Sequence, residues 1–460
     1  MPSRDTVKRT ELIDRIWERD PTVWTGADEA KWLGWLDEPQ RMRERVAEIV
    51  AFADEVADDG LDAIVLLGMG GSSLAPEVLR RTFGSEAFHV LDTTHPRAIR
   101  ELEASIDVER TLFISASKSG STLETRSHTD YFWERSGKNG ARFVAITDPG
   151  SALEQTATER GFRRIFSGEP TIGGRYSALS SFGIVPAALM GVDVARLLAN
   201  AERMIELCRE ENGNPGYELG RELSTGWQEG RDKVCIAETD GSFGLWAEQL
   251  IAESTGKQGK GLVPAPGESP DGPDRQLATP QIADPYSLGG EFFRWEFAVA
   301  VAGTVLEINP FDQPDVQAAK DKTNEVLATG EEPQVELDGS IESLLAQAHE
   351  RDYVCVQAFI EPTEENDRRI DDLVRKLRRR SGLVVTHGYG PRYLHSTGQL
   401  HKGGPNTGLF LQVVDDVGEE LAIPGKPFGF ARLIRAQAAG DYASLQERGR
   451  RVARIHIEDS

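Results

Sequence analysis

Two turns rich in glycine and serine have the composition of anion-binding sites. Residues 68–76 read GMGGSSLAP and residues 115–125 read SASKSGSTLET, each directly after an apolar run. Glycine permits tight turns and close backbone approach, and the N–H groups at a helix N-terminus favour anions. Gly71 and Ser72 are the candidate contacts in the first turn. A dinucleotide fingerprint needs a different glycine spacing, and a plain serine-capped turn is the other alternative.

The second turn concentrates hydrogen-bond donors. Its hydroxyl and amino groups belong to Ser117, Lys118, Ser119, Ser121 and Thr122. Such a set suits a phosphate far better than a neutral group. The alternative is a serine-rich turn closed by a capping box, in which Ser121 pairs with Glu124. Two such turns along one chain favour a phosphate or sugar-phosphate site.

Two further segments hold side chains suited to acid–base chemistry. Residues 173–183 read GGRYSALSSFG and place Arg175 beside glycines, and residues 248–261 read EQLIAESTGKQGKG. Gln249 and Glu253 are four residues apart, so they share one face of a predicted helix. Glu253 is a candidate general base, with Arg175 as a fixed cation. The alternatives are a solvated carboxylate and a surface arginine.

Two polar segments complete the candidate set. Residues 309–320 read NPFDQPDVQAAK and predict a stiff turn before a helix that carries Lys320, which could also be an exposed lysine. Residues 386–408 hold three of the eight histidines, namely His387, His395 and His401. Their spacings of eight and six do not match a helical zinc motif, so acid–base work is more plausible than metal binding.

Alternating strands and helices would position these segments. Short apolar strands alternate with helices over residues 61–168, and the alternation returns at 233–267 and 353–457, with a polar loop predicted at 268–288. This pattern predicts mainly parallel sheets flanked by helices on both faces, a three-layer αβα arrangement. Ligands of such sheets bind beyond the carboxyl ends of the strands, where the turns described above would lie.

A length of 460 residues exceeds what one hydrophobic core usually supports. We therefore predict an α/β protein with an N-terminal helical segment (1–44) and two domains. The first would span residues 45–210. The second would span residues 211–460 and include a C-terminal α/β extension.

Charge and hydropathy argue against several partners. There are 52 Lys and Arg against 75 Asp and Glu, a net charge of −23, which disfavours nucleic-acid binding. The longest apolar stretch, 297–308, is too short to span a membrane, and the N-terminus lacks the apolar core of a signal peptide. The three cysteines show no metal-ligand spacing. We expect a cytoplasmic protein with no metal, nucleic-acid partner or membrane partner.

In this order, the motifs resemble the glucose-6-phosphate isomerase (phosphoglucose isomerase) family, most closely the isomerase half of bacterial transaldolase/phosphoglucose-isomerase fusions. The resemblance extends from about residue 45 to the C-terminus and depends on GMGGSSLAP, SKSGST followed by LET, GGRYS, ESTGK, and NPFDQP with its later lysine. It implies two sugar-isomerase (SIS-type) domains with the site between them, usually in a homodimer. The chain shows no transaldolase barrel, so a separate transaldolase could be a partner.

The resemblance also implies the reaction and the roles of the residues. Glucose 6-phosphate and fructose 6-phosphate would interconvert by ring opening and a cis-enediol, without a cofactor. Glu253, Arg175 and Lys320 would be catalytic, and the ring would be opened by His395, since no histidine lies between Glu253 and Lys320. The implied substrate-binding residues are Gly71, Ser72, Ser117, Lys118, Ser119, Thr122, Gln249, Gln313 and His401, the last also being the second choice for ring opening. A dual phosphoglucose/phosphomannose isomerase and a non-catalytic sugar-phosphate sensor remain open alternatives.

Overall fold

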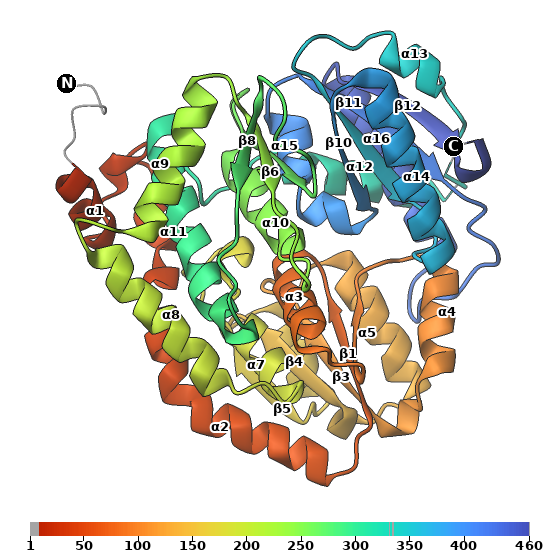
Figure 1. The fold of residues 1–460 in the computed structure, drawn as a ribbon. Coiled ribbons are helices and arrows are strands. Elements are labelled where there is room, and N and C mark those ends of the chain that lie inside the picture. The colour runs from red at the N-terminus through yellow and green to blue at the C-terminus, as the bar shows by residue number, and fades with distance from the viewer. Residues whose placement is uncertain (1–8, 331, 334, 460) are drawn as a thin grey trace.

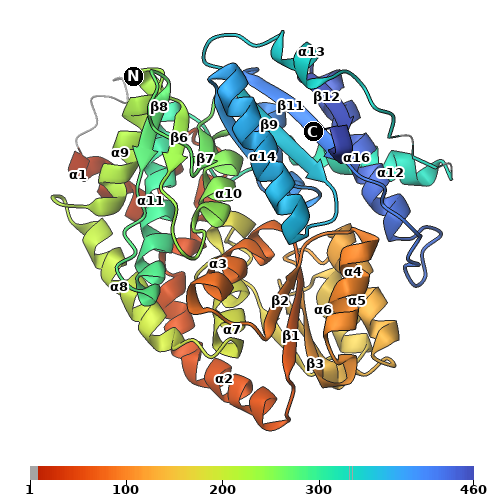
Figure 2. The same ribbon diagram turned by 45° about the vertical axis from the view of Figure 1, so that its right-hand side comes forward.

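The computed structural model describes residues 9–330, 332–333 and 335–459, apart from the side chains of residues 316–320. Every ladder between its named strands is parallel, and helices flank the sheets (Figures 1 and 2). The predicted α/β class with mainly parallel sheets is therefore confirmed.

The first sheet has the strand order β2-β1-β3-β4-β5. Its strands are β1 (Ala63–Gly68), β2 (Phe88–Leu91), β3 (Thr111–Ala116), β4 (Phe143–Thr147) and β5 (Arg164–Ser167). Successive side chains of β1 enter different cores: Ile64 and Leu66 face one, and Val65 and Leu67 face the other. A strand with two buried faces reads as a continuous apolar run, which is why these strands were predictable.

Helices cover both faces of this sheet. One core is shared with α2 (Glu38–Asp58), α3 (Leu74–Phe83), α7 (Ser181–Leu189) and α8 (Val194–Arg209). The other core is shared with α4 (Pro96–Ser105), α5 (Leu123–Arg135) and α6 (Ala152–Glu159). The arrangement is the predicted three-layer one, and the turns after β1 and β3 open at its carboxyl edge.

A second, three-stranded sheet has the order β7-β6-β8. It consists of β6 (Lys233–Ile236), β7 (Val263–Pro266) and β8 (Arg275–Ala278). The strand β8 lies inside the segment predicted as a polar loop, so that prediction was wrong. Its pattern is inverted, because Gln276 is buried and bonded to the carbonyls of Leu223 and Arg231 while Leu277 is 46% exposed.

A third sheet has the order β10-β9-β11-β12. Its strands are β9 (Tyr353–Phe359), β10 (Val384–Tyr389), β11 (Gly408–Val414) and β12 (Arg451–His456), all of them predicted from the sequence. The helices α13 (Ile341–Leu345) and α14 (Glu364–Ser381) pack on one face, and α16 (Phe430–Glu447) packs on the other. Residues 211–460, predicted as one domain, thus carry two sheets.

Glu268 joins these two sheets. Its buried carboxylate follows β7 and accepts hydrogen bonds from the backbone N–H of Val385 in β10 (2.8 Å) and from Nε of Arg378 in α14 (2.5 Å). The neighbouring edges of β7 and β10 share no backbone ladder. The carboxylate therefore supplies a link that backbone hydrogen bonds do not.

The remaining helices fill the space around the sheets. They are α1 (Arg9–Trp17), α9 (Pro215–Gln228), α10 (Gly244–Thr255), α11 (Leu288–Leu306), α12 (Val316–Ala328) and α15 (Gly398–Gly403). The helix α11 holds most of the longest apolar stretch and is buried on nearly every side, as expected of a core helix. Across the described residues, no helix is both long enough and apolar enough to cross a bilayer.

We expect Glu268→Ala to lower the free energy of unfolding by about 2–3 kcal/mol, because it leaves a buried N–H and an arginine without their acceptor. Chemical denaturation would measure this. Asp372→Ala, which removes an exposed partner of Arg375 on the same helix, is the control and should cost less than about 1 kcal/mol. Equal effects of the two substitutions would contradict the linking role of Glu268.

Candidate active site

A cavity of about 430 Å³ lies at the carboxyl edge of the first sheet. It is bounded by the turns after β1, β3 and β4, by α10, by the segment that follows α11, and by the short helix η10 (Arg392–His395). Ten of the predicted site residues line it: Gly71, Ser72, Ser117, Lys118, Ser119, Thr122, Gln249, Glu253, Gln313 and His395. Side chains far apart in the sequence therefore meet in one cavity.

The glycines of the first turn allow three backbone segments to touch. A Cβ on Gly71 would lie 2.1 Å from the carbonyl oxygen of Gly174, and one on Gly70 would lie 2.5 Å from the carbonyl oxygen of His395. Gly70 also has a φ of +55°, which favours glycine. The glycines are thus required by the contact of η5 (Gly70–Ser72) with η8 (Gly174–Tyr176) and η10.

The hydroxyl groups of the second turn form hydrogen bonds within the turn. The backbone N–H of Gly120 donates to Ser117 Oγ (3.1 Å), and Ser119 Oγ lies 2.7 Å from Ser121 Oγ. The helix α5 then begins after Thr122, whose side chain makes no capping bond. The N-cap residue is thus Thr122 and not Ser121 of the alternative capping box, and the carboxylate of Glu124 bonds His395.

Lys118 brings a cation to the same turn. Its Nζ lies 2.5 Å from Oδ2 of Asp148 and 3.2 Å from the carbonyl oxygen of Glu169. Burial raises the pKa of Asp148, although the lysine opposes this effect. The lysine is about a quarter exposed, so it can also reach an anion in the cavity.

Arg175 is buried behind the cavity and holds three segments together. Its Nε donates to Ser254 Oγ (2.8 Å), and its Nη1 donates to Gln313 Oε1 (2.6 Å). Its Nη2 donates to the carbonyl oxygens of Pro310 (2.8 Å) and Asp312 (2.9 Å). The guanidinium is 1% exposed, which excludes the alternative of a surface arginine.

Glu253 lies between this arginine and a glutamine. Its Oε1 is 3.5 Å from Arg175 Nη1, and its Oε2 accepts from Gln249 Nε2 (3.0 Å). The same amide group donates to the carbonyl oxygen of His395 (2.8 Å). The carboxylate is 7% exposed and lines the cavity, so it is not on a solvated face. A fixed, nearly dry carboxylate suits proton transfer to and from a bound ligand.

Lys257 is a structural residue of the site that the sequence did not single out. Its buried Nζ donates to the carbonyl oxygens of Asn309 (2.7 Å) and Asp312 (2.6 Å) and to Asp312 Oδ1 (2.6 Å). Burial, with help from the nearby Arg175, lowers the pKa of Lys257 to about 8. The lysine fixes the loop that presents Gln313, and its place in the ESTGK motif was the available signal.

His395 forms a pair with Glu124, which the sequence analysis missed. His395 Nε2 lies 3.0 Å from Oε1 of Glu124, and both side chains are largely buried. Glu124 closes the serine-rich turn motif, but its spacing from Ser121 suggested a cap, and no local pattern pointed to His395. The imidazole reaches the cavity from the third sheet, whereas the carboxylate comes from the first.

Two side chains considered from the sequence lie elsewhere, and a third is not described. His401 is buried away from this cavity, with Nε2 3.6 Å from Cys355 Sγ and Nδ1 3.3 Å from Gln357 Nε2. His387 lies on the wall of another cavity. Lys320 belongs to α12, and its side chain is among those that the structure does not describe.

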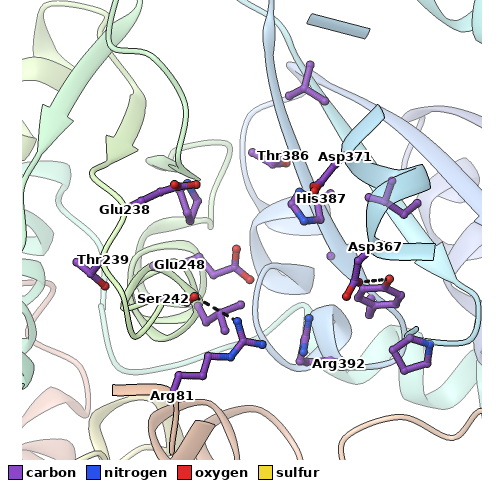
Figure 3. Close-up of a pocket in the computed structure, with 18 of the residues that line it drawn as sticks. Arg81, Glu238, Thr239, Ser242, Glu248, Asp367, Asp371, Thr386, His387 and Arg392 are labelled. Atoms are coloured by element: carbon purple, nitrogen blue, oxygen red, sulfur yellow. Dashed lines mark hydrogen bonds between the residues drawn. The ribbon is translucent and has the colours of Figure 1, made fainter. Parts of the chain in front are cut away.

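That other cavity, of about 550 Å³, lies between the second and third sheets (Figure 3). Its walls carry charges of both signs, with Arg392 below and Asp367 and Asp371 on the side of α14. It shares α10 and η10 with the candidate active site, since Glu248 precedes Gln249 and Arg392 opens the helix of His395. In the part of the chain that is described, no group of three or more metal-binding side chains is found.

Comparison with known proteins agrees with this geometry. A family model described as phosphoglucose isomerase matches residues 38–212. Glucose-6-phosphate isomerase of Symbiobacterium thermophilum is 27% identical over 387 residues, which are 63% of this chain and 86% of that protein. Glucose-6-phosphate isomerase of Rubrobacter xylanophilus is 31% identical over 246 residues, which are 49% of this chain and 57% of that protein. The chain thus spans most of the first relative and little more than half of the second.

Two solved structures share the fold. A hypothetical protein, TT0462, from Thermus thermophilus aligns with a TM-score of 0.61 and 24% identity, covering 70% of this chain and 94% of that one. A glucose-6-phosphate isomerase from Chlamydia trachomatis aligns with a TM-score of 0.51 and 19% identity, covering 69% of this chain and 78% of that one. At these identities the likeness concerns the fold alone.

The contact of Gly71 with Gly174 can be tested by substitution. Gly71→Ala should force the η8 segment, and with it Arg175, away from the cavity, and any catalytic turnover in this cavity should fall about 100-fold. Gly173→Ala is the matched control, because its added Cβ would meet only one atom, at 3.9 Å. Steady-state kinetics of both variants would decide, and equal activities would mean that the close contact is not needed.

Proposed function

Because a family model described as phosphoglucose isomerase matches residues 38–212, we propose that this chain interconverts glucose 6-phosphate and fructose 6-phosphate. The observation that carries the proposal is Glu253, a buried carboxylate beside a buried arginine in the same cavity as the serine-rich turn. The substrate would be a sugar phosphate, and the reaction needs no redox cofactor or metal, since a proton moves between adjacent carbons.

The serine-rich turn would bind the phosphate and fix the far end of the sugar. Ser117, Ser119 and Thr122 offer hydroxyl donors at the N-terminus of α5, with Lys118 as the cation. Gly71 and Ser72 line the cavity beside them and would contact the sugar itself. When the phosphate is bound in this turn, C1 and C2 of the sugar are held within reach of the catalytic groups. The binding energy of the phosphate is thus used to orient the reacting carbons.

Glu253 would then move the proton between C2 and C1 on one face of the cis-enediol. A single base can remove and return the proton, so the product differs from the substrate only in the position of the carbonyl group. The negative charge that develops on the enediolate oxygen would be stabilised by Arg175 Nη1, which lies 3.5 Å from the same carboxylate. Gln249 and Gln313 would hold Glu253 and Arg175 in position.

The closed sugar ring must be opened first, and His395 is the candidate acid–base group. Its Nε2 is engaged by Glu124, which leaves Nδ1 as the nitrogen for the ring oxygen or its hydroxyl. The carboxylate would fix the tautomer and stabilise the imidazolium when it forms. His401 is a weaker candidate because it is buried against Cys355 and Gln357. Lys320 remains a proposed catalytic residue on the motif alone.

We further infer a cytoplasmic homodimer, to which a separate transaldolase could bind. The support is the resemblance of the motifs, and native mass spectrometry with pull-down from lysate would test both associations.

The preference between C2 epimers is tested by substrate comparison. Comparing turnover of mannose 6-phosphate and glucose 6-phosphate would distinguish a dual phosphoglucose/phosphomannose isomerase from an isomerase of glucose 6-phosphate alone.

Replacement of the proposed base is the direct test. Glu253→Gln should lower kcat by about 10²–10⁴-fold while sugar-phosphate binding persists, because the amide cannot accept the proton. Formation of glucose 6-phosphate from fructose 6-phosphate would be followed with an NADP-linked dehydrogenase in EDTA. Glu222→Gln, at an exposed site on α9, is the control for the substitution.

The outcomes of this assay separate the alternatives. Near wild-type activity of Glu253→Gln would refute the assignment of the base. If the wild-type chain gave no turnover, yet fructose 6-phosphate still raised its melting temperature, a non-catalytic sugar-phosphate sensor would be favoured. Neither turnover nor binding would refute the proposed function.

Dilution tests whether one chain supplies the whole site. The described groups given roles above, Lys320 excepted, surround one cavity within a single chain, so specific activity should stay constant when a dimer dissociates. Activity would be measured across a dilution series whose oligomeric state is followed by mass photometry. A fall in specific activity that tracks dissociation would show that a second subunit contributes to the site.

A further inference from the structure

One oxygen of Glu124 accepts two hydrogen bonds from the C-terminal part of the chain. His395 Nε2 lies 3.0 Å from Oε1, and Gln437 Nε2 donates to the same atom at 2.7 Å. Gln437 belongs to α16 and is 2% exposed. A buried amide that donates to a carboxylate both stabilises its ionised form and restricts its orientation.

The orientation of the Gln437 amide is itself fixed. Thr94 Oγ1, in the turn after β2, donates to Gln437 Oε1 at 2.6 Å, and Thr94 is fully buried. An ionised carboxylate only accepts hydrogen bonds, so a flipped amide would place its oxygen against that of Glu124. The amide therefore has one satisfactory orientation, with its NH₂ group toward Glu124.

The same helix also holds the segment of His395. Asp441, one turn after Gln437, accepts from Tyr393 Oη (2.6 Å) and from Lys402 Nζ (2.6 Å), and all three side chains are buried. Tyr393 lies two residues before His395 in η10. One face of α16 thus anchors the carboxylate through Gln437 and the imidazole through Tyr393.

We propose that Gln437, oriented by Thr94, is a positioning residue that holds Glu124 against His395. The helix α16 would then set the geometry of the acid–base pair from a part of the chain that follows every predicted site residue. The kinetic consequences of this inference rest on the proposed function, whereas the hydrogen-bond network itself does not.

Among the described residues, the titratable groups near this cluster include His128, the Lys402–Asp441 pair and the pair of His95 with Asp415. His128 on α5 is buried near Glu124, and burial lowers its pKa to about 4, so it stays neutral at physiological pH. The Lys402–Asp441 ion pair lies one turn along α16. The pH dependence of Gln437→Glu is therefore compared with that of the wild-type chain, in which these neighbouring groups are the same.

Two substitutions separate positioning from packing. Gln437→Leu keeps the bulk and removes the donor, and kcat should fall about tenfold with KM changed less than about twofold. Gln437→Glu should have nearly wild-type kcat at pH 6, where a shared proton restores a donor, and about a tenfold loss at pH 8.5, where both carboxylates are ionised. Gln446→Leu, at an exposed position on α16, is the control.

The kinetic outcomes are decisive in both directions. Wild-type kcat in Gln437→Leu would overturn the proposal, as would a loss in Gln437→Glu that is the same at every pH, since a merely structural role would give that result. Thr94→Val should lower kcat in the same direction and by less, because it frees the amide to turn without removing it.

A measurement without turnover separates this inference from the proposed function. The titration of His395 would be followed in proton–nitrogen NMR spectra of the histidine rings, assigned with His395→Asn. The added negative charge in Gln437→Glu should raise the midpoint by about half a unit or more, with no change in Gln446→Leu. An unchanged midpoint would overturn the role of Gln437. A raised midpoint in a chain that turns over no sugar phosphate would overturn only the proposed function.

Discussion

The candidate site depends on the hydrogen bonds that the buried guanidinium of Arg175 donates. Removing a cation from water is costly, and the cost is offset only where its donors are satisfied in good geometry. Here the donors meet a serine hydroxyl, a glutamine oxygen and two carbonyl oxygens, with Glu253 at 3.5 Å. These partners belong to α10 and to the loop after α11. Because the buried guanidinium needs all of these acceptors, it fixes the relative positions of three segments.

Close backbone contacts at two glycines fix the positions of further segments around the cavity. The turn after β1 can approach η8 and η10 only because Gly70 and Gly71 lack a Cβ. Lys257 holds the loop of Gln313 from the other side. Backbone contacts of this kind have little freedom to adjust, since the atoms in contact are main-chain atoms. Small shifts in any of the three segments would therefore change the shape of the cavity.

Much of the fold was readable from the sequence, because strands buried on two faces are continuous apolar runs and are separated by amphipathic helices. The strand β8 was not, since its buried side holds Gln276 and its apolar residue faces solvent. The resemblance to the family was also readable, and a family model matches it over residues 38–212. The contact of Glu124 with His395 was missed because the local spacing suggested a capping box with Ser121, while His395 lies 271 residues away. No local pattern reports such a contact.

The long separations also explain why the C-terminal part of the chain belongs to the site. Gln437 and Glu124 are 313 residues apart, and His95 reaches Asp415 across a similar span. Bringing such distant residues together costs chain entropy that only the folded cores of both regions can offset. Polar groups that are buried and paired at such a junction stabilise one arrangement and penalise others, because any mismatch leaves a group unsatisfied. The contact of His395 with Glu124 can therefore form only when the first and third sheets are both folded and docked, which ties the geometry of the cavity to the folding of both regions.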